Sequence, residues 1–233
     1  MLRLIALLLM LSAPAFGAEP PFTPSRLFPQ AGPAVAAGVL VWVPGTYGKD
    51  APGPPDPPDI VGRLAGRGLD VVQFLRKRDD DPLDRGARIL MRGLKALRLA
   101  GYRRIIVAGH SRGAWIALTA LAHPNRAHAI IAVSTAAHGT RPERQIQARA
   151  DWQALWASAR PAPTRVVLVQ LAEDPYDPDP QWRLDVVNAA VARTRIRLMS
   201  IFQPPLPLGH GGVYEPAFDE RHGALIADFA DPR

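Results

Sequence analysis

The sequence predicts an α/β fold, in which a mainly parallel sheet is covered by helices on both faces. Two observations predict it. Six short runs of mainly apolar, often β-branched residues lie along the chain, which is typical of strands buried on both sides. Segments with helical periodicity separate most of these runs, and such alternation is the pattern of parallel sheets. The length of 233 residues suits one domain with a large core.

The predicted elements follow in chain order. Strands are expected at residues 37–43, 69–75, 104–108, 128–133, 165–171 and 195–202. Helices are expected at residues 84–99, 114–122, 144–159 and 182–192. A closing amphipathic helix is predicted over 218–229, where Leu225, Ile226 and Phe229 recur at helical spacing.

The first residues have the pattern of a secretory signal peptide, predicted over 1–17. A positive start at Arg3 precedes an apolar run over 4–11 and a small-residue end. Cleavage is predicted before Ala18, with cleavage after Ala15 and an uncleaved N-terminal anchor as alternatives. The apolar run is shorter than the roughly 20 residues of a transmembrane helix. We therefore expect an exported protein, periplasmic or secreted.

Composition narrows the classes of partner. The net charge is +7, and most of the positive charge is arginine scattered along the chain. No zinc-ligand spacing, RNA-binding motif or phosphate loop accompanies it, so we expect no nucleic-acid partner, no metal and no cofactor. The positive charge favours anionic substrates or contact with an anionic envelope surface. The alternative is that the high arginine content is a general feature of proteins from the source and has no functional meaning. The absence of cysteine excludes a disulfide framework.

The most informative motif is GHSRG at residues 109–113, between the strand at 104–108 and the helix at 114–122. A serine in such a sharp strand-to-helix turn has a strained backbone, and flanking glycines remove side chains that would clash there. The turn also puts the hydroxyl at a helix N-terminus, where N–H groups favour developing negative charge. The motif predicts Ser111 as a nucleophile.

This motif in this context resembles the α/β-hydrolase superfamily, over roughly residues 36–232. The family orders its catalytic residues as serine, acid and histidine. The resemblance implies Asp174 as the acid, because it follows the strand at 165–171. Asp177 and Glu173 are the alternatives, and an ordinary solvated acidic turn would also explain the segment. If Asp174 is the acid, Asp177 is expected to be a turn residue.

The resemblance also implies His210 as the base, since it lies in a glycine-flanked loop after the last strand. His222 falls in the closing helix and is expected at the surface. The remaining histidines precede the acid and do not fit the family order; they are His110, His123, His128 and His138. A serine needs a base to become nucleophilic, imidazole can serve, and a carboxylate orients the imidazole.

The oxyanion hole has a candidate in the loop PGTYG at 44–48. In the family the preceding strand commonly ends in His-Gly, and here Pro44 replaces the histidine. The resemblance implies backbone N–H donors from Thr46 and Arg112, with Tyr47 as an alternative to Thr46. A simple Pro-Gly turn is the other interpretation.

Expectations can also be stated for four segments outside these motifs. Residues 18–35 are expected to be irregular, which leaves room only for a reduced form of the N-terminal hairpin before the domain at 36–233. The proline-rich loop at 49–59 should lie near the mouth of the site. The charged loop at 76–82 is expected to be solvated, or else to contact substrate. Residues 140–160 are long enough for a small cap, although core packing explains Trp152 and Trp156 equally well.

The function predicted from these residues is that of an exported serine hydrolase that cleaves an acyl bond through an acyl-serine intermediate. A carboxylic ester is the preferred substrate, while thioesters, lactones and peptides stay open because one fold carries many chemistries. The alternative is a catalytically silent hydrolase-fold protein that binds a ligand in the cell envelope.

Overall fold

The computed structural model describes residues 22–47, 53–76 and 82–232. The predicted signal peptide and parts of the loops at 49–59 and 76–82 lie outside these ranges. In the described part of the chain, no helix has both the length and the apolar character needed to span a membrane.

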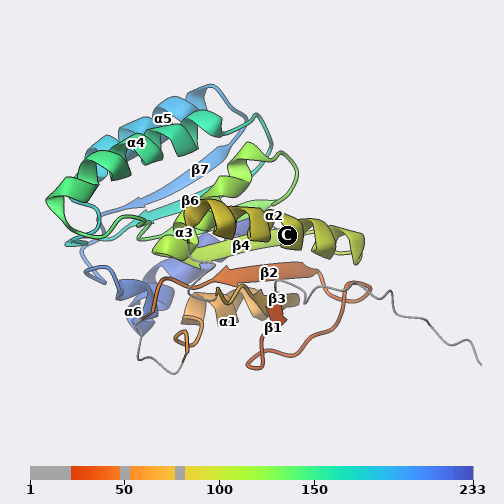
Figure 1. Ribbon diagram of the computed structural model, residues 1–233. Coiled ribbons are helices and arrows are strands. Elements are labelled where there is room, and N and C mark those ends of the chain that lie inside the picture. The colour runs from red at the N-terminus through yellow and green to blue at the C-terminus, as the bar shows by residue number, and fades with distance from the viewer. Residues whose placement is uncertain (1–21, 48–52, 77–81, 233) are drawn as a thin grey trace, which may run out of the picture.

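A seven-stranded sheet forms the centre of the described domain, in the order β1-β3-β2-β4-β5-β6-β7 (Figure 1). The strands are β1 (Thr23–Pro24), β2 (Gly38–Val43), β3 (Leu69–Gln73), β4 (Ile105–His110), β5 (Ala129–Val133), β6 (Arg165–Gln170) and β7 (Arg197–Phe202). The six predicted strands are confirmed, although β3 ends two residues early and β4 extends to His110. All neighbours pair in parallel except β1, which is antiparallel to β3.

The segment before β2, predicted to be irregular, contains the short strand β1. Its Thr23 pairs with Gln73 and its Pro24 with Val72. The buried carboxylate of Asp70 accepts hydrogen bonds from the backbone N–H groups of Ala31 and Gly32 at 2.7 and 2.9 Å. These bonds hold the segment against the sheet edge. As expected, the N-terminal hairpin is reduced, here to one two-residue strand.

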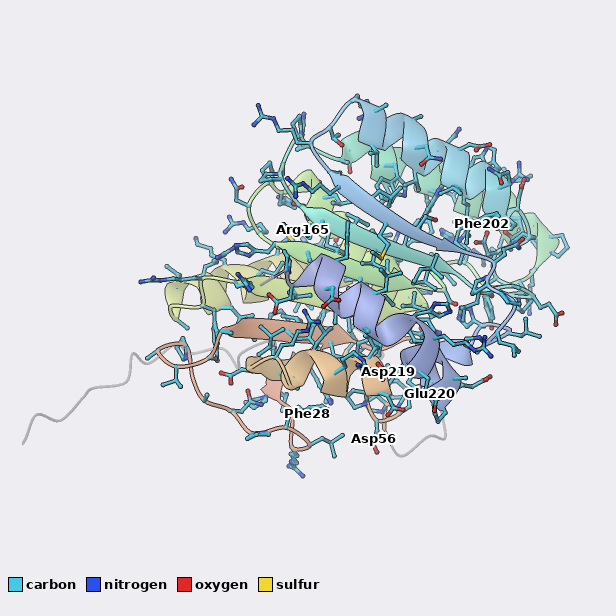
Figure 2. All side chains as sticks on the ribbon, turned by 180° about the vertical axis from the view of Figure 1, so that it is seen from behind. Phe28, Asp56, Arg165, Phe202, Asp219 and Glu220 are labelled. Carbon is cyan, nitrogen blue, oxygen red and sulfur yellow. The ribbon has the colours of Figure 1, made fainter. Side chains whose placement is uncertain are left out.

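Two apolar layers cover the sheet, because alternate residues of a strand point to opposite faces. On β2, Val39, Val41 and Val43 face one layer, while Leu40 and Trp42 face the other. The first layer is built by α2 (Leu83–Leu99), α3 (Arg112–Leu118), α4 (Pro142–Ser158) and α5 (Pro180–Ala192). The second is built by α1 (Asp59–Ala65), α6 (Pro216–Phe218) and α7 (Ala224–Ala230), seen in front of the sheet in Figure 2.

The helices depart from prediction in several places. Helix α1 was not predicted, because it is two turns long and follows a proline-rich stretch; its Ile60, Val61 and Leu64 are nevertheless buried. Helix α3 begins at Arg112, directly after the serine, and is extended by a 3₁₀ turn over Thr119–Ala122.

The closing helix is not continuous. It begins as α6, passes through a π turn at Asp219–Gly223 and continues as α7. Asp219 accepts two hydrogen bonds from Arg63 of α1, at 2.8 and 2.6 Å, which ties the turn to its neighbour (Figure 2). His222 lies in this turn, half-buried and edge-on to the ring of Phe218, rather than at the surface as expected.

Residues 140–160 form a helix of the first layer instead of a separate cap. Trp152 and Trp156 of α4 are fully buried in the core, and Trp152 donates a hydrogen bond through Nε1 to the carbonyl oxygen of Arg183. The core-packing interpretation of the two tryptophans is therefore correct.

Parallel pairing brings the carboxyl ends of the strands to one edge. Val43 of β2 pairs with Gly109 of β4, and His110 pairs with Val133 of β5. Val133 in turn pairs with Val169 of β6. The loops that leave β2, β4, β6 and β7 therefore emerge side by side, at the edge where open α/β sheets place their ligand sites.

Candidate active site

The turn around Ser111 is as sharp as the motif predicts. Strand β4 ends at His110 and α3 begins at Arg112, so Ser111 alone reverses the chain, with φ 55° and ψ −123°. Its backbone N–H donates to the carbonyl oxygen of Val133 at 3.0 Å, and its own carbonyl accepts from Trp115 and Ala136. A non-glycine residue in this conformation costs on the order of 1–3 kcal/mol, so the surrounding hydrogen bonds must hold it in place.

Both motif glycines are required by close backbone contacts. A Cβ atom on Gly109 would lie 2.5 Å from the carbonyl carbon of Gly113. One on Gly113 would lie 1.9 Å from the carbonyl oxygen of Val43. The strand, the helix and the loop after β2 can approach the serine only because these two side chains are missing.

The structure brings Ser111, His210 and Asp174 together in one hydrogen-bonded line. The Nε2 atom of His210 lies 2.8 Å from the Oγ of Ser111, and its Nδ1 lies 2.9 Å from both carboxylate oxygens of Asp174. The Asp174 side chain is 2% exposed and that of His210 is 19% exposed. Because a carboxylate only accepts, Nδ1 carries a proton toward Asp174, which leaves Nε2 of the neutral ring to accept from the serine hydroxyl.

The loop after β6 fixes the carboxylate of Asp174. Glu173 adopts a left-handed conformation with φ 59°, and its side chain is exposed. In the next residue, Asp174, the side-chain Oδ1 accepts a hydrogen bond from the backbone N–H of Tyr176 at 2.9 Å. Gly209 donates to the carbonyl oxygen of Ala172 at 2.7 Å, which joins this loop to the loop that carries His210.

Asp177 lies in the turn that begins at Asp174, as expected if Asp174 is the acid, but its side chain is not solvated. It is buried, its Oδ2 accepts from Nε2 of Gln170 at 2.8 Å, and its Oδ1 lies 3.2 Å from Nε of Arg183. Burial raises the pKa of Asp177 and lowers that of Arg183, while each charge favours the ionised form of the other. Asp177 is thus neither the partner of His210 nor a solvated turn residue, but one half of a buried ion pair.

His110 supports the site, although the order of residues had set it aside. It is buried, and its Nε2 lies 2.7 Å from the backbone carbonyl oxygen of His210. Burial lowers the pKa of His110 to about 4, so the ring is neutral and carries its proton on Nε2, which donates to that carbonyl. The edge of the ring faces Tyr214, whose pKa burial raises to about 12. Its place in the sequence, directly before Ser111, was the available signal.

Tyr176 is a second residue of the site that was not predicted from the sequence. Its ring lies beside the imidazole of His210, with centroids 4.1 Å apart and planes inclined by 35°. An aromatic face so close to an imidazole stabilises the ring when it carries a charge.

The loop after β2 lies directly beside Ser111. A Cβ on Gly45 would lie 3.0 Å from the Cβ of Ser111, and Thr46 is the next residue. The carbonyl of Pro44 accepts from the buried side chain of Arg76 at 2.8 Å, which anchors this loop to the end of β3. Arg76 thus departs from the solvated charge expected for residues 76–82. Arg112 opens α3, so its N–H is one of the first four in the helix, which lack intrahelical acceptors.

A cavity of about 820 Å³ adjoins the site. Among the described residues it is lined by Leu83, Asp84, Arg112, Ala137, His138, Gly139, Thr140, Arg141, Arg144 and Tyr176. Its lining residue Arg112 follows Ser111 in the chain, and the ring of its lining residue Tyr176 lies beside that of His210. Within the described ranges, no cluster of three or more His, Cys, Asp or Glu side chains is placed to hold a metal ion.

The sequence matches no family model and no curated protein. Solved structures do match. The esterase Pf2001 of Pyrococcus furiosus aligns with a TM-score of 0.61 at 16% identity, over 83% of this chain and 81% of that one. A truncated carbohydrate esterase from gut microbiota aligns with a TM-score of 0.60 at 12% identity, over 84% and 85%.

A third match is a phospholipase/carboxylesterase from Dyadobacter fermentans, with a TM-score of 0.55 at 15% identity over 86% of this chain and 94% of that one. Identities this low establish the fold and leave the activity to be argued from the site. With its parallel sheet, its serine turn and these neighbours, the chain has the fold of the α/β-hydrolase superfamily.

Proposed function

We propose that this protein is a serine hydrolase that cleaves carboxylic esters through an acyl-serine intermediate. The observation that carries the proposal is the continuous line from Asp174 through His210 to Ser111, with contacts of 2.9 and 2.8 Å. Each contact is within the range in which a base activates a nucleophile and a carboxylate orients the base.

In the first half of the reaction, the Oγ of Ser111 attacks the ester carbonyl carbon while Nε2 of His210 takes the hydroxyl proton. The resulting tetrahedral intermediate collapses when the bond to the alcohol oxygen breaks, and His210 returns the proton to that oxygen. The products are a free alcohol and an acyl-serine. The carboxylate of Asp174 stabilises the imidazolium that forms between these two steps and does not itself take the proton.

In the second half, a water molecule replaces the alcohol. His210 takes a proton from the water as its oxygen attacks the acyl carbon, and then returns a proton to Oγ as the bond to Ser111 breaks. A carboxylic acid leaves and the enzyme is regenerated.

The negative charge on the carbonyl oxygen requires donors on both sides of Ser111. We assign these to the backbone N–H groups of Arg112 and Thr46. Arg112 is supported by its place at the start of α3, and Thr46 by the contact of its neighbour Gly45 with the serine. Removal of one such donor typically costs a factor of about 100 to 1000 in rate.

The choice of a carboxylic ester is supported by the neighbours, since those quoted above are named as esterases. Labelling with a fluorophosphonate probe tests the nucleophile. The wild-type protein should be labelled and should hydrolyse p-nitrophenyl esters, whereas Ser111→Ala should do neither and should keep its circular dichroism. Ser158→Ala, at the exposed end of α4, is the matched control and should behave as wild type. A labelled Ser111→Ala variant, or an inert wild-type protein, would refute the proposal.

We also propose that the protein is exported and loses residues 1–17. The support is the pattern of the first residues alone. Expression of the full chain followed by cell fractionation and N-terminal sequencing tests it: the mature protein should begin at Ala18 and appear in the periplasm or the medium. Full-length protein in the cytoplasm would contradict export.

A further inference from the structure

The geometry points to a substrate class for this site: we infer that the preferred ester carries a second, negatively charged group, such as a carboxylate, which binds to Arg141 and Arg144 in the cavity beside the nucleophile. This inference rests on the proposed esterase function. It concerns the part of the substrate that does not react.

Among the described residues, the charged groups that line the cavity are mainly positive. They are the arginines Arg112, Arg141 and Arg144 and the carboxylate of Asp84. Asp84 already accepts a hydrogen bond at 2.7 Å from Arg88, one turn further along α2, and this bond lowers its pKa. This carboxylate is therefore partly satisfied by an arginine outside the cavity, and Arg141 and Arg144 leave the described part of the lining with positive charge.

The arginines differ in what holds them. The guanidinium of Arg112 donates to the carbonyl oxygen of Ala137 at 2.9 Å, which fixes it against the loop that follows β5. Among the described residues, no hydrogen bond or ion pair engages the side chains of Arg141 and Arg144, and both are exposed. Arg141 is the extended N-cap residue of α4 and Arg144 lies in the first turn of that helix, and both line the cavity. Two guanidinium groups that line one cavity can both donate hydrogen bonds to a carboxylate.

His138, which also lines the cavity, has a carboxylate of the protein beside it. Its Nε2 lies 2.8 Å from the Oδ2 of Asp151, so its ring is held by a carboxylate of α4. The recognition of an anion is thus left to the arginines.

The cavity is also placed and sized for this role. Its volume of about 820 Å³ falls in the usual range for small-molecule sites, about 300–1,000 Å³. Arg112 adjoins the nucleophile and the ring of Tyr176 adjoins the base, so a substrate whose carbonyl lies at Ser111 extends directly into it. A group that lies a few bonds from the reacting carbonyl would meet Arg141 and Arg144.

The anion can belong to the acyl part or to the alcohol part of the ester, and the test has an arm for each. In the acyl arm, mono-p-nitrophenyl glutarate is compared with neutral p-nitrophenyl valerate. In the alcohol arm, 4-acetoxybenzoate is compared with its neutral methyl ester. The intrinsic reactivity of each ester cancels when the variant is compared with wild type on the same substrate.

The test variant is Arg141→Gln/Arg144→Gln. The control is Arg92→Gln/Lys95→Gln, which removes the same charge from exposed positions of α2 that do not line the cavity. We expect the test variant to lower kcat/KM about tenfold for the charged ester of at least one arm, and by less than about twofold for its neutral partner. The control should change both by the same factor. Arg144→Glu should reduce hydrolysis of the charged ester further still.

Salt provides a second readout. An increase of ionic strength from about 0.01 to about 1 M shortens the screening length from roughly 30 to roughly 3 Å. The advantage of the charged ester should therefore shrink in wild type and change little in the test variant.

An unchanged ratio of charged to neutral ester in both arms, with hydrolysis of the neutral esters intact, would overturn the anionic substrate and leave the esterase standing. Absence of both ester hydrolysis and fluorophosphonate labelling would overturn the esterase, and the inference with it.

Discussion

The backbone N–H of Asp177 donates to the carbonyl oxygen of Asp174 at 3.0 Å, so two buried carboxylates share a single turn and face in different directions. Asp174 points to His210, whereas Asp177 points to Arg183. Arg183 also donates to the carbonyl oxygens of Thr135 and Tyr176, at 2.7 and 3.3 Å. The pair of Asp177 and Arg183 thus holds the turn from which Asp174 reaches the histidine.

The two aspartates should therefore respond differently to the same substitution. Asp174→Asn should lower kcat by up to a factor of ~10⁴ with little loss of stability, because the amide cannot keep His210 in the required tautomer. Asp177→Asn should lower the free energy of unfolding by about 3 kcal/mol, since it removes one partner of a buried ion pair. Ester hydrolysis and urea denaturation measure the two effects. A large loss of kcat in a stable, folded Asp177→Asn variant would contradict these roles.

His110 should make stability depend on pH. Its pKa of about 4 in the folded protein lies below the ordinary value of 6.5, so the unfolded chain binds the proton more readily. Stability from this residue is complete above pH 6.5 and is lost as the pH falls toward 4, by about 3 kcal/mol in total. His110→Gln keeps a donor for the His210 carbonyl and removes the titration.

The measurement is the difference in unfolding free energy between wild type and His110→Gln, at about pH 7.5 and about pH 4.5. Groups common to both proteins cancel, so wild type should lose about 2–3 kcal/mol relative to the variant at the lower pH. A pH-independent difference would show that His110 does not titrate as described.

Two glycines should separate stability from catalysis. Gly113→Ala places a methyl group 1.9 Å from the backbone oxygen of Val43, and should cost at least about 3 kcal/mol of stability. Gly45→Ala meets Ser111 and His110 at 3.0 and 3.1 Å, and should cost only about 1 kcal/mol. To relieve these contacts the loop after β2 must move. This movement should displace the N–H of Thr46 and lower kcat about 100-fold. Normal turnover of Gly45→Ala would argue against an oxyanion role for this loop.

Tyr176 should support the imidazolium through its ring and not through its hydroxyl. Tyr176→Ala should reduce kcat about two- to fivefold, the usual value of a cation–π contact, whereas Tyr176→Phe should retain wild-type kcat. Steady-state kinetics on a neutral ester measures both. Equal losses in the two variants would instead indicate that the hydroxyl matters.

The sequence by itself determined the frame of this protein. Apolar, β-branched runs specify buried parallel strands wherever they stand, so the six parallel strands could be placed to within about two residues at each end. The serine turn was equally clear, because the two glycines that the turn requires, Gly109 and Gly113, lie within two residues of Ser111 in the sequence. Given that frame, the chain order that the resemblance supplied placed His210.

Only the tertiary structure decided which acidic side chain faces the histidine, and what the neighbours of the site do. Asp174 and Asp177 are alike in type and in local sequence, and they differ because Arg183, which comes from α5, pairs with one of them. The burial of Arg76, the hydrogen bond from His110 to the His210 carbonyl and the gathering of Arg141 with Arg112 around one cavity likewise join segments far apart in the chain. Side-chain direction, burial and electrostatic environment are properties of the packed molecule, since each depends on atoms that sequence spacing does not locate.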